Sequence, residues 1–195
     1  MTRLVLASGS AIRRKVLENA GIPFAVQTSG VDEDALKQDW VGDDPCDLAV
    51  HLAEAKALAV QVPGDVLVLG ADQVLSCDNA LFDKAKSVAE ARDRLLYLRG
   101  KTHTLHCGLA AVRAGEVIWR YRTESHLSVR PFSDAFLETY LDRAGEVLTK
   151  SVGAYAYEGL GAQLFHAVDG DYYAILGLPL VPLMELLRQQ NVIET

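Results

Sequence analysis

Apolar residues follow two patterns along this chain: short unbroken runs, and longer stretches in which they recur every three or four positions. Unbroken runs are typical of strands buried on both faces, and the longer spacing is typical of helices packed on a core. The runs predict strands at 4–6, 24–27, 66–69 and 164–168. The helical spacing predicts helices at 11–20, 45–59, 87–98 and 133–143 and after Pro179. Strand-forming residues on both sides of Ala114 and Gly115 predict an antiparallel hairpin over 103–129.

Residues with strong positional preferences mark several boundaries of these elements. Ser87 followed by Glu90 is typical of a capping box, and Gly21 and Gly100 stand where helices are expected to end. The acidic segment 31–36 is predicted as a loop. Because strands and helices alternate without a linker or a repeat, the pattern predicts a single α/β domain, with two lobes around a cleft.

Composition and charge narrow the function classes. Of the 195 residues, 50% are hydrophobic and 23% are charged, which is enough to build one sizeable core. The formal net charge of −7 argues against nucleic-acid binding. Cys46, Cys77 and Cys107 form no CxxC pair, so we expect no disulfide and a reducing, cytoplasmic location. No apolar run approaches the roughly 18 residues of a membrane span, so we expect neither insertion nor export.

A first candidate site lies at the start of the predicted helix 11–20. Ser8 and Ser10 precede this helix, and Arg13 and Arg14 lie in its first turns. A helix N-terminus with exposed N–H groups and nearby guanidinium groups suits a phosphate. The alternative is an ordinary N-cap followed by solvated basic residues. The chain contains no GxxxxGK[ST] sequence, so this is not a Walker A loop.

A second candidate is Asp72, predicted just beyond the carboxyl end of a buried strand, where ligands of open α/β sheets bind. Glu33, with its acidic neighbours Asp32 and Asp34, could join Asp72 around a divalent metal ion. The alternatives are that Asp72 caps a turn and that residues 32–34 form a solvated acidic run.

Other polar residues give weaker signals. Lys56, on a predicted helix, and Lys84, after a predicted turn, are expected to face solvent unless a phosphate lies nearby. His103 and His106 are three residues apart in a predicted strand, so they face opposite sides and cannot share one metal ion. The chain lacks a GxSxG elbow and a GxGxxG turn after a strand, which argues against a serine hydrolase and a dinucleotide fold.

Motifs in a fixed order cover most of the chain. They are LASGSAIRR (6–14), VDED (31–34), EAKA (54–57), GADQV (70–74), Lys84, RGKTH (99–103), VGAYAYEGLG (152–161) and GDYYAILGLPL (170–180). This set resembles the Maf family of nucleoside triphosphate pyrophosphatases nearly end to end. Five positions depart from the usual family pattern: proline is replaced by Ala11 and Ala85, glycine by Asp83, Lys or Cys by Ser151, and Ala by Val152.

The resemblance implies a Maf/ITPase-like α/β fold over residues 1–195, with an elongated mixed central sheet and two lobes flanking a cleft. It implies hydrolysis of a nucleoside triphosphate to the monophosphate and pyrophosphate, with Mg²⁺ or Mn²⁺. It also implies that Asp72 activates water, as a general base or through the metal ion, and that Glu33 and Asp72 hold that ion. The phosphate-binding residues implied are Ser8, Ser10, Arg13, Arg14, Lys56 and Lys84.

The resemblance also points to a substrate class. Ile12, Gln73 and Glu158 stand at three positions that distinguish branches of the family, and they look like the branch that acts on 7-methyl-GTP. The branch preferring dTTP and UTP is one alternative, and a nucleotide-binding regulator of cell division, linked to septum formation, is another. The expected partner is the nucleotide, with a homodimer as a candidate assembly and with no nucleic acid or membrane.

Overall fold

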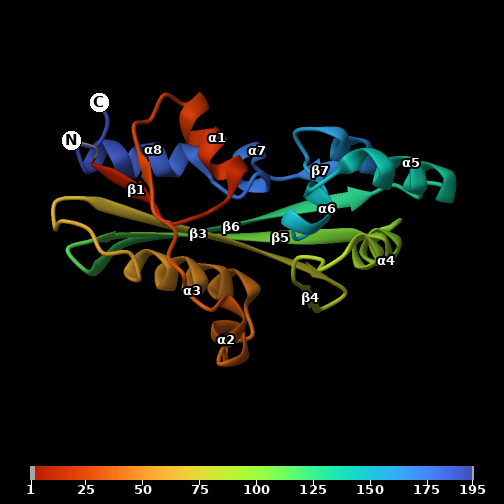
Figure 1. Ribbon diagram of the computed structural model, residues 1–195, viewed down its shortest axis with the longest axis horizontal. Coiled ribbons are helices and arrows are strands. Elements are labelled where there is room, and N and C mark those ends of the chain that lie inside the picture. The colour runs from red at the N-terminus through yellow and green to blue at the C-terminus, as the bar shows by residue number, and fades with distance from the viewer. Residues whose placement is uncertain (1–2, 195) are drawn as a thin grey trace. The chain divides into compact units, whose positions relative to one another are not determined.

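The computed structural model of the protein describes residues 3–194 and contains a seven-stranded mixed sheet in that range (Figure 1). The strands are β1 (Leu4–Leu6), β2 (Ala25–Val26), β3 (Leu67–Cys77), β4 (Ala80–Phe82), β5 (Thr102–Arg113), β6 (Glu116–Val129) and β7 (Phe165–Asp169). They are arranged in the order β2-β1-β3-β5-β6-β7, and β4 pairs with β3 outside this path. Since β1 pairs in parallel and β7 pairs antiparallel, the α/β class with a mixed sheet is confirmed.

The described helices include all those that the hydrophobic spacing predicts. They are α1 (Ala11–Asn19), α2 (Glu33–Gln38), α3 (Pro45–Leu58), α4 (Val88–Leu98), α5 (Asp134–Ala144), α6 (Val147–Lys150), α7 (Tyr172–Ile175), α8 (Leu180–Gln189) and the 3-10 helix η1 (Leu160–Leu164). Within the described range, no helix is long and apolar enough to cross a bilayer. The three cysteines are free thiols, as the sequence predicts.

The chain divides into two compact units, and β3, β5 and β6 contribute residues to both. The first unit contains the residues up to Gln73, 107–123 and those from Tyr172 onward. The second unit contains 74–106 and 124–171. The prediction of one domain over 1–195, with a cleft between lobes, stays a prediction.

In the first unit, helices cover both faces of the sheet, with α1 and α8 on one face and α3 on the other (Figure 1). Leu4 and Leu6 of β1 belong to the core cluster that includes residues of α1 and α8. Val5, between them, belongs to a second cluster with Ala57 of α3. Alternate residues of one strand are therefore buried on opposite faces, which explains why the apolar runs are unbroken.

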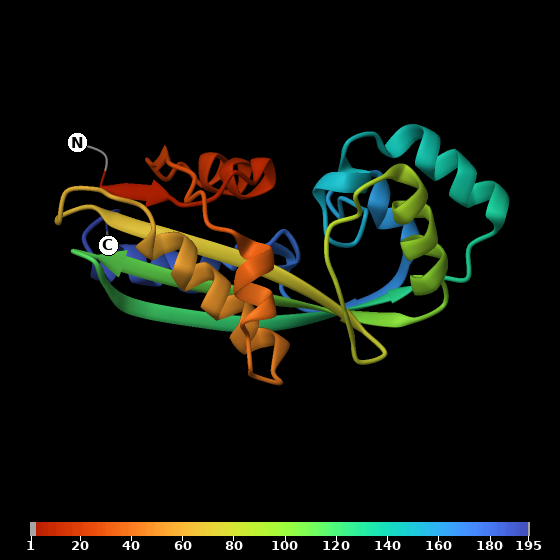
Figure 2. The same cartoon turned by 60° about the horizontal axis from the view of Figure 1, so that its bottom comes forward.

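In the second unit, α4 packs against α5 and α6 (Figure 2). The predicted N-cap of α4 is confirmed, since the Ser87 hydroxyl accepts a hydrogen bond from Glu90 N at 3.1 Å. The Glu90 carboxylate accepts from Lys86 N at 2.9 Å. Ser87 therefore caps the helix as expected, while the Glu90 carboxylate bonds to the backbone of Lys86 and not to that of Ser87.

Two sequence predictions about local structure are wrong. The segment 31–36 is not a loop, because α2 begins at Glu33, with Asp32 accepting a hydrogen bond from Ala35 N at 3.0 Å. The acidic residues of its first turn favour the helix through the helix dipole. Asp72 does not lie beyond its strand, because β3 continues to Cys77. It is β1 that stops here, where its last residue, Leu6, pairs with Leu69.

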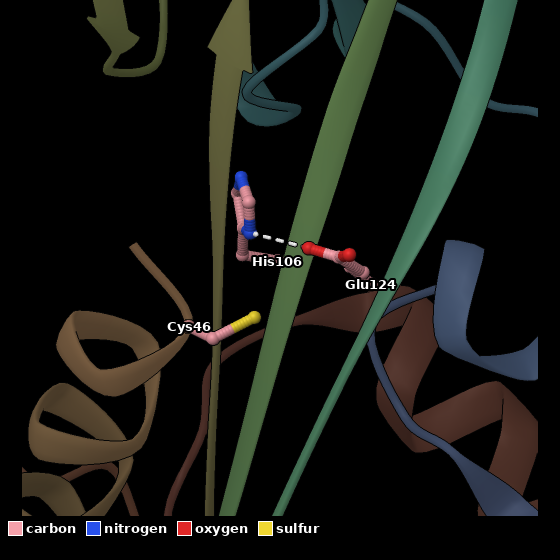
Figure 3. A group of neighbouring side chains, drawn as sticks. All are labelled: Cys46, His106 and Glu124. Atoms are coloured by element: carbon pink, nitrogen blue, oxygen red, sulfur yellow. Dashed lines mark ion pairs between the residues drawn. The ribbon is translucent and has the colours of Figure 1, made fainter. Parts of the chain in front are cut away.

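His103 and His106, which are predicted to face opposite sides of one strand, have different partners in the second unit. His103 Nε2 lies 2.7 Å from the Tyr155 hydroxyl in the buried interior. His106 instead contacts Ser76, with 2.7 Å between His106 Nε2 and Ser76 Oγ. Its other ring nitrogen lies 3.5 Å from a carboxylate oxygen of Glu124 on β6 (Figure 3).

Burial of His103 makes stability depend on pH. The side chain is 1% exposed, and burial lowers the pKa of His103 to about 4, so the folded protein keeps it neutral. The unfolded chain protonates this imidazole below pH 6.5. Its contribution to stability is therefore complete above pH 6.5 and decreases as pH falls to about 4, by roughly 3 kcal/mol in total.

We expect His103→Gln to flatten this pH dependence, because a neutral amide does not titrate. The measurement is the free energy of unfolding in urea between pH 7 and pH 4. The matched control is His166→Gln, which removes an exposed histidine of the same unit and should keep the wild-type slope. An equal slope in wild type and His103→Gln would contradict the assignment.

Candidate active site

The residues of the first candidate site form a compact hydrogen-bonded group at the start of α1. Ser10 is the N-cap, and its hydroxyl accepts from Arg13 N at 3.4 Å. Ser8 Oγ accepts from Ser10 N at 3.3 Å and from Arg13 Nη1 at 3.1 Å. Arg14 is exposed, whereas Arg13 is buried. The two neighbouring guanidinium groups therefore have different environments.

The second candidate site is built around a buried ammonium group. Lys56 Nζ of α3 donates a hydrogen bond to Asp72 Oδ1 of β3, and it lies 2.9 Å from Glu33 Oε1 of α2. Lys56 and Asp72 are each 6% exposed, so Lys56 does not face solvent as an isolated helix-surface lysine would, and its role in phosphate binding stays a prediction. Two carboxylates, one from α2 and one from β3, therefore contact the same ammonium. In the sequence analysis Lys56 and Asp72 were independent candidates, whereas in the fold their side chains are in direct contact.

The position of α3 is what brings Lys56 to Asp72. The helix begins with Pro45 at its first turn, after Asp44, whose carboxylate accepts from Cys46 N at 2.8 Å. Where α3 crosses the sheet, the facing residue is Gly70, and an added Cβ there would lie 1.9 Å from the Ala53 carbonyl oxygen. Only glycine permits this approach, so Gly70 helps to build the site. Its sequence motif, GADQV (70–74), gave no sign of this role.

Gln73, the neighbour of Asp72, holds the segment that contains α7. Its side-chain nitrogen donates to Ala174 O at 2.9 Å and to Ile175 O at 3.2 Å. Ile12, another predicted specificity residue, is partly buried and packs against the core of the first unit. Both predicted specificity residues, Gln73 and Ile12, thus contact other parts of the protein itself.

Two predicted site residues belong to the second unit. Lys84 is exposed after β4, and Glu158 is exposed in the turn before η1. Beside Lys84, the carbonyl of Asp83 accepts a hydrogen bond from buried Arg94, which also donates to Val152 O at 2.7 Å. Desolvation lowers the pKa of Arg94. Arg94 thus ties together two of the positions that depart from the usual family pattern.

Comparison with known proteins places this arrangement in a family. The family model described as "Maf-like protein" matches residues 3–190. The chain belongs to the Maf family. A nucleoside triphosphate pyrophosphatase of Maricaulis maris (strain MCS10) is 54% identical over 195 residues, covering 100% of both chains.

Two further relatives of this Maf protein differ in the substrate that their names specify. A nucleoside triphosphate pyrophosphatase of Caulobacter vibrioides (strain ATCC 19089 / CIP 103742 / CB 15) is 50% identical, covering 96% of each chain. A 7-methyl-GTP pyrophosphatase of Rhizobium meliloti (strain 1021) is 42% identical, covering 98% of each chain. The family resemblance seen in the sequence is confirmed.

The donor set of this Maf site fits a hard divalent cation. Asp72 and Glu33 come from different elements, yet each places a carboxylate oxygen on the same Lys56 ammonium. A carboxylate pair that converges on one positive charge can hold another, and Mg²⁺ is commonly bound by one or two carboxylates together with substrate phosphates. Metal binding by Glu33 and Asp72 stays a prediction with a suitable set of ligands.

Proposed function

We propose that this Maf protein hydrolyses nucleoside triphosphates to the monophosphate and pyrophosphate. The observation that carries the proposal is the contact of the buried Lys56 ammonium with two carboxylates, the buried Asp72 and the partly exposed Glu33. Relatives with 45% to 54% identity over nearly the whole chain carry the name nucleoside triphosphate pyrophosphatase. Their similarity supports the same reaction type for this chain.

The proposed chemistry assigns each member of the group a step. Water attacks phosphorus, the α–β phosphoanhydride bond breaks, and Asp72 accepts the proton that the water loses. Lys56 orients Asp72 before the attack, because its ammonium donates to Asp72 Oδ1. When bound by Glu33 and Asp72, a divalent cation supplies positive charge that polarises phosphoryl oxygens and makes water more acidic.

Phosphate binding is proposed for residues that present donors or positive charge. Ser10 caps α1, where the helix N-terminus favours an anion, and Arg14 is exposed in the first turns of the same helix. Lys84 is an exposed positive charge of the second unit, for which phosphate binding is likewise proposed. On a chain of net charge −7, basic residues at a binding site would admit one triphosphate while the whole protein repels longer polyanions.

The reaction is tested by measuring pyrophosphate release from a panel of nucleoside triphosphates. The panel is run with Mg²⁺, with Mn²⁺, and after removal of metal with EDTA. We expect release with at least one nucleotide in the presence of metal and a strong decrease with EDTA. Release of inorganic phosphate without pyrophosphate, or no hydrolysis of any nucleotide, would contradict the proposed function.

For the base, we propose 7-methyl-GTP as the preferred substrate, with dTTP or UTP as the alternative outcome of the same panel. Glu158 is exposed, so its carboxylate is available to a ligand. Guanine presents two adjacent donors, N1–H and N2–H, that one carboxylate can accept together, and the N7 methyl group adds positive charge. Uracil and thymine offer a single imide donor. The name of the Rhizobium meliloti relative supports this assignment.

Glu158→Gln is expected to lower the ratio of kcat/KM for 7-methyl-GTP over UTP by about tenfold to a hundredfold, because a bidentate base contact is worth roughly 1 to 3 kcal/mol. Pyrophosphate release itself should persist. Glu146→Gln, a second exposed glutamate of the same unit, is the matched control. An unchanged ratio, or a wild type that prefers UTP, would remove Glu158 from base recognition.

A further inference from the structure

The Arg13 side chain joins three separate segments of the first unit. Arg13 Nε donates to Gly177 O at 2.8 Å, and Nη1 donates to Ala71 O at 2.8 Å and to Ser8 Oγ at 3.1 Å. The acceptors belong to the turn after α7, to β3, and to the loop before α1. Arg13 itself is 9% exposed. A residue expected to bind substrate phosphate therefore directs at least two of its nitrogens to the protein.

These contacts and those of Gln73 flank Asp72 on both sides. Ala71, whose carbonyl accepts from Arg13, immediately precedes Asp72, and Gln73 immediately follows it. Arg13 and Gln73 also hold the same segment, residues 172–178, through the carbonyls of Gly177, Ala174 and Ile175. The backbone at Asp72 is thus fastened before and after the carboxylate to one segment of the chain.

The geometry requires the guanidinium group specifically. Its planar fork carries donors in fixed directions, so one side chain can bond three acceptors in different segments, whereas a lysine ammonium is a single point. The acceptor turn is also built for a close approach. Gly177 has φ of +81°, and an added Cβ there would lie 3.2 Å from Arg13 Nε.

We propose that Arg13 and Gln73 are positioning residues that fix Asp72, and that they act on the reaction through segment 172–178 and β3. This inference rests on the proposed function, since Asp72 is the base of that reaction. Charge-assisted hydrogen bonds in a buried site hold a geometry firmly, and a displacement of about 1 Å at a catalytic group can cost about a hundredfold in rate. Binding of phosphate by Arg13 and reading of the base by Gln73 are the competing roles.

The first test separates positioning from phosphate binding by kinetics. Arg13→Lys keeps the charge and loses the fork, so a positioning role predicts that kcat falls about tenfold to a hundredfold while KM changes by less than about threefold. Lys15→Ala, which removes a neighbouring exposed charge, is the control and should retain kcat. Overturning results are a wild-type kcat in Arg13→Lys, or a KM increase as the main effect.

The second variant, Gln73→Leu, tests the other tether. Positioning predicts that kcat falls by a similar factor for every nucleotide, so the ratio between 7-methyl-GTP and UTP stays within about twofold of wild type. A base-reading role predicts instead that the ratio changes while the better substrate keeps its kcat. A changed ratio with retained kcat would overturn the role given to Gln73.

Hydrogen exchange provides a readout that does not need activity. The amides of Leu176, Gly177 and Leu178 donate to carbonyls within segment 172–178, at 3.2, 2.8 and 2.9 Å. Peptides covering this segment should exchange faster in Arg13→Lys and in Gln73→Leu than in wild type or Lys15→Ala. If wild type releases no pyrophosphate, the proposed function fails. The exchange data would still show whether Arg13 and Gln73 hold segment 172–178 in place. Unchanged exchange in both variants would overturn the proposal.

Discussion

Asp72→Asn is expected to reduce kcat for pyrophosphate release by on the order of a thousandfold, the range of a lost general base. The amide has the size of the carboxylate but neither its charge nor its basicity. The fold should persist, because the amide oxygen can still accept a hydrogen bond from Lys56, as Asp72 Oδ1 does. The measurement is single-nucleotide kinetics under saturating metal, with circular dichroism to confirm the fold.

The control for this change is Asp65→Asn, an exposed aspartate of the same unit that makes the same chemical substitution away from the site. It should retain full activity. If Asp72→Asn also kept near-normal turnover, water activation would have to be assigned to another group, and the proposed mechanism would be wrong.

Gly70→Ala should lower the free energy of unfolding by roughly 3 kcal/mol, and the protein that remains folded should have a lower kcat. An added Cβ would lie 1.9 Å from the Ala53 carbonyl oxygen and 3.1 Å from the Ala57 Cβ, so α3 must move away from β3. Lys56 is carried by α3 and would move with it. Urea unfolding and kcat are the two measurements.

Gly64→Ala is the matched control, because an added Cβ there would lie 3.7 Å from the Ala114 Cβ, an ordinary contact. It should change the free energy of unfolding by less than about 1 kcal/mol. A Gly70→Ala protein as stable and as active as the control would show that the helix does not need this close approach.

Local signals in the sequence predicted local structure well. Ser87 was sufficient to place the start of α4, because a hydroxyl at the N-cap stabilises a helix through hydrogen bonds to nearby backbone N–H groups. The hairpin turn at Ala114 and Gly115 followed from the strand-forming residues around it, and both residues have positive φ. Such features depend on a few adjacent residues, so they can be read from a sequence.

The acidic start of α2 was missed because two opposite interpretations of the same residues exist. Asp32 and Glu33 suit a solvated loop, and they equally suit an N-cap and first turn. The strand end predicted before Asp72 was wrong for a related reason: polar residues at 72 and 73 end an apolar run, although both side chains find partners in the fold. Sequence alone does not show those partners.

The site was predicted as a set of residue types and missed as a set of contacts. Asp72, Glu33 and Lys56 were each identified, but the shared ammonium depends on three elements meeting in space. Arg13 was assigned to phosphate because of its place in a helix start, and its contacts to Ala71 and Gly177 involve residues 58 and 164 positions away. No local pattern encodes such distant carbonyl acceptors.

The close contact between α3 and β3 also limits how this protein can change over evolutionary time. Ala49, Ala53 and Ala57 are each 0% exposed and are spaced four residues apart, so they form one line along α3. Gly70 and Gly108 face that line, and an added Cβ on either would overlap backbone atoms of α3. A larger residue in this line of α3 would need a smaller residue facing it on the sheet. The facing residues are already glycine, so no smaller residue is available. We therefore expect larger side chains on α3 to be tolerated only on its other surfaces.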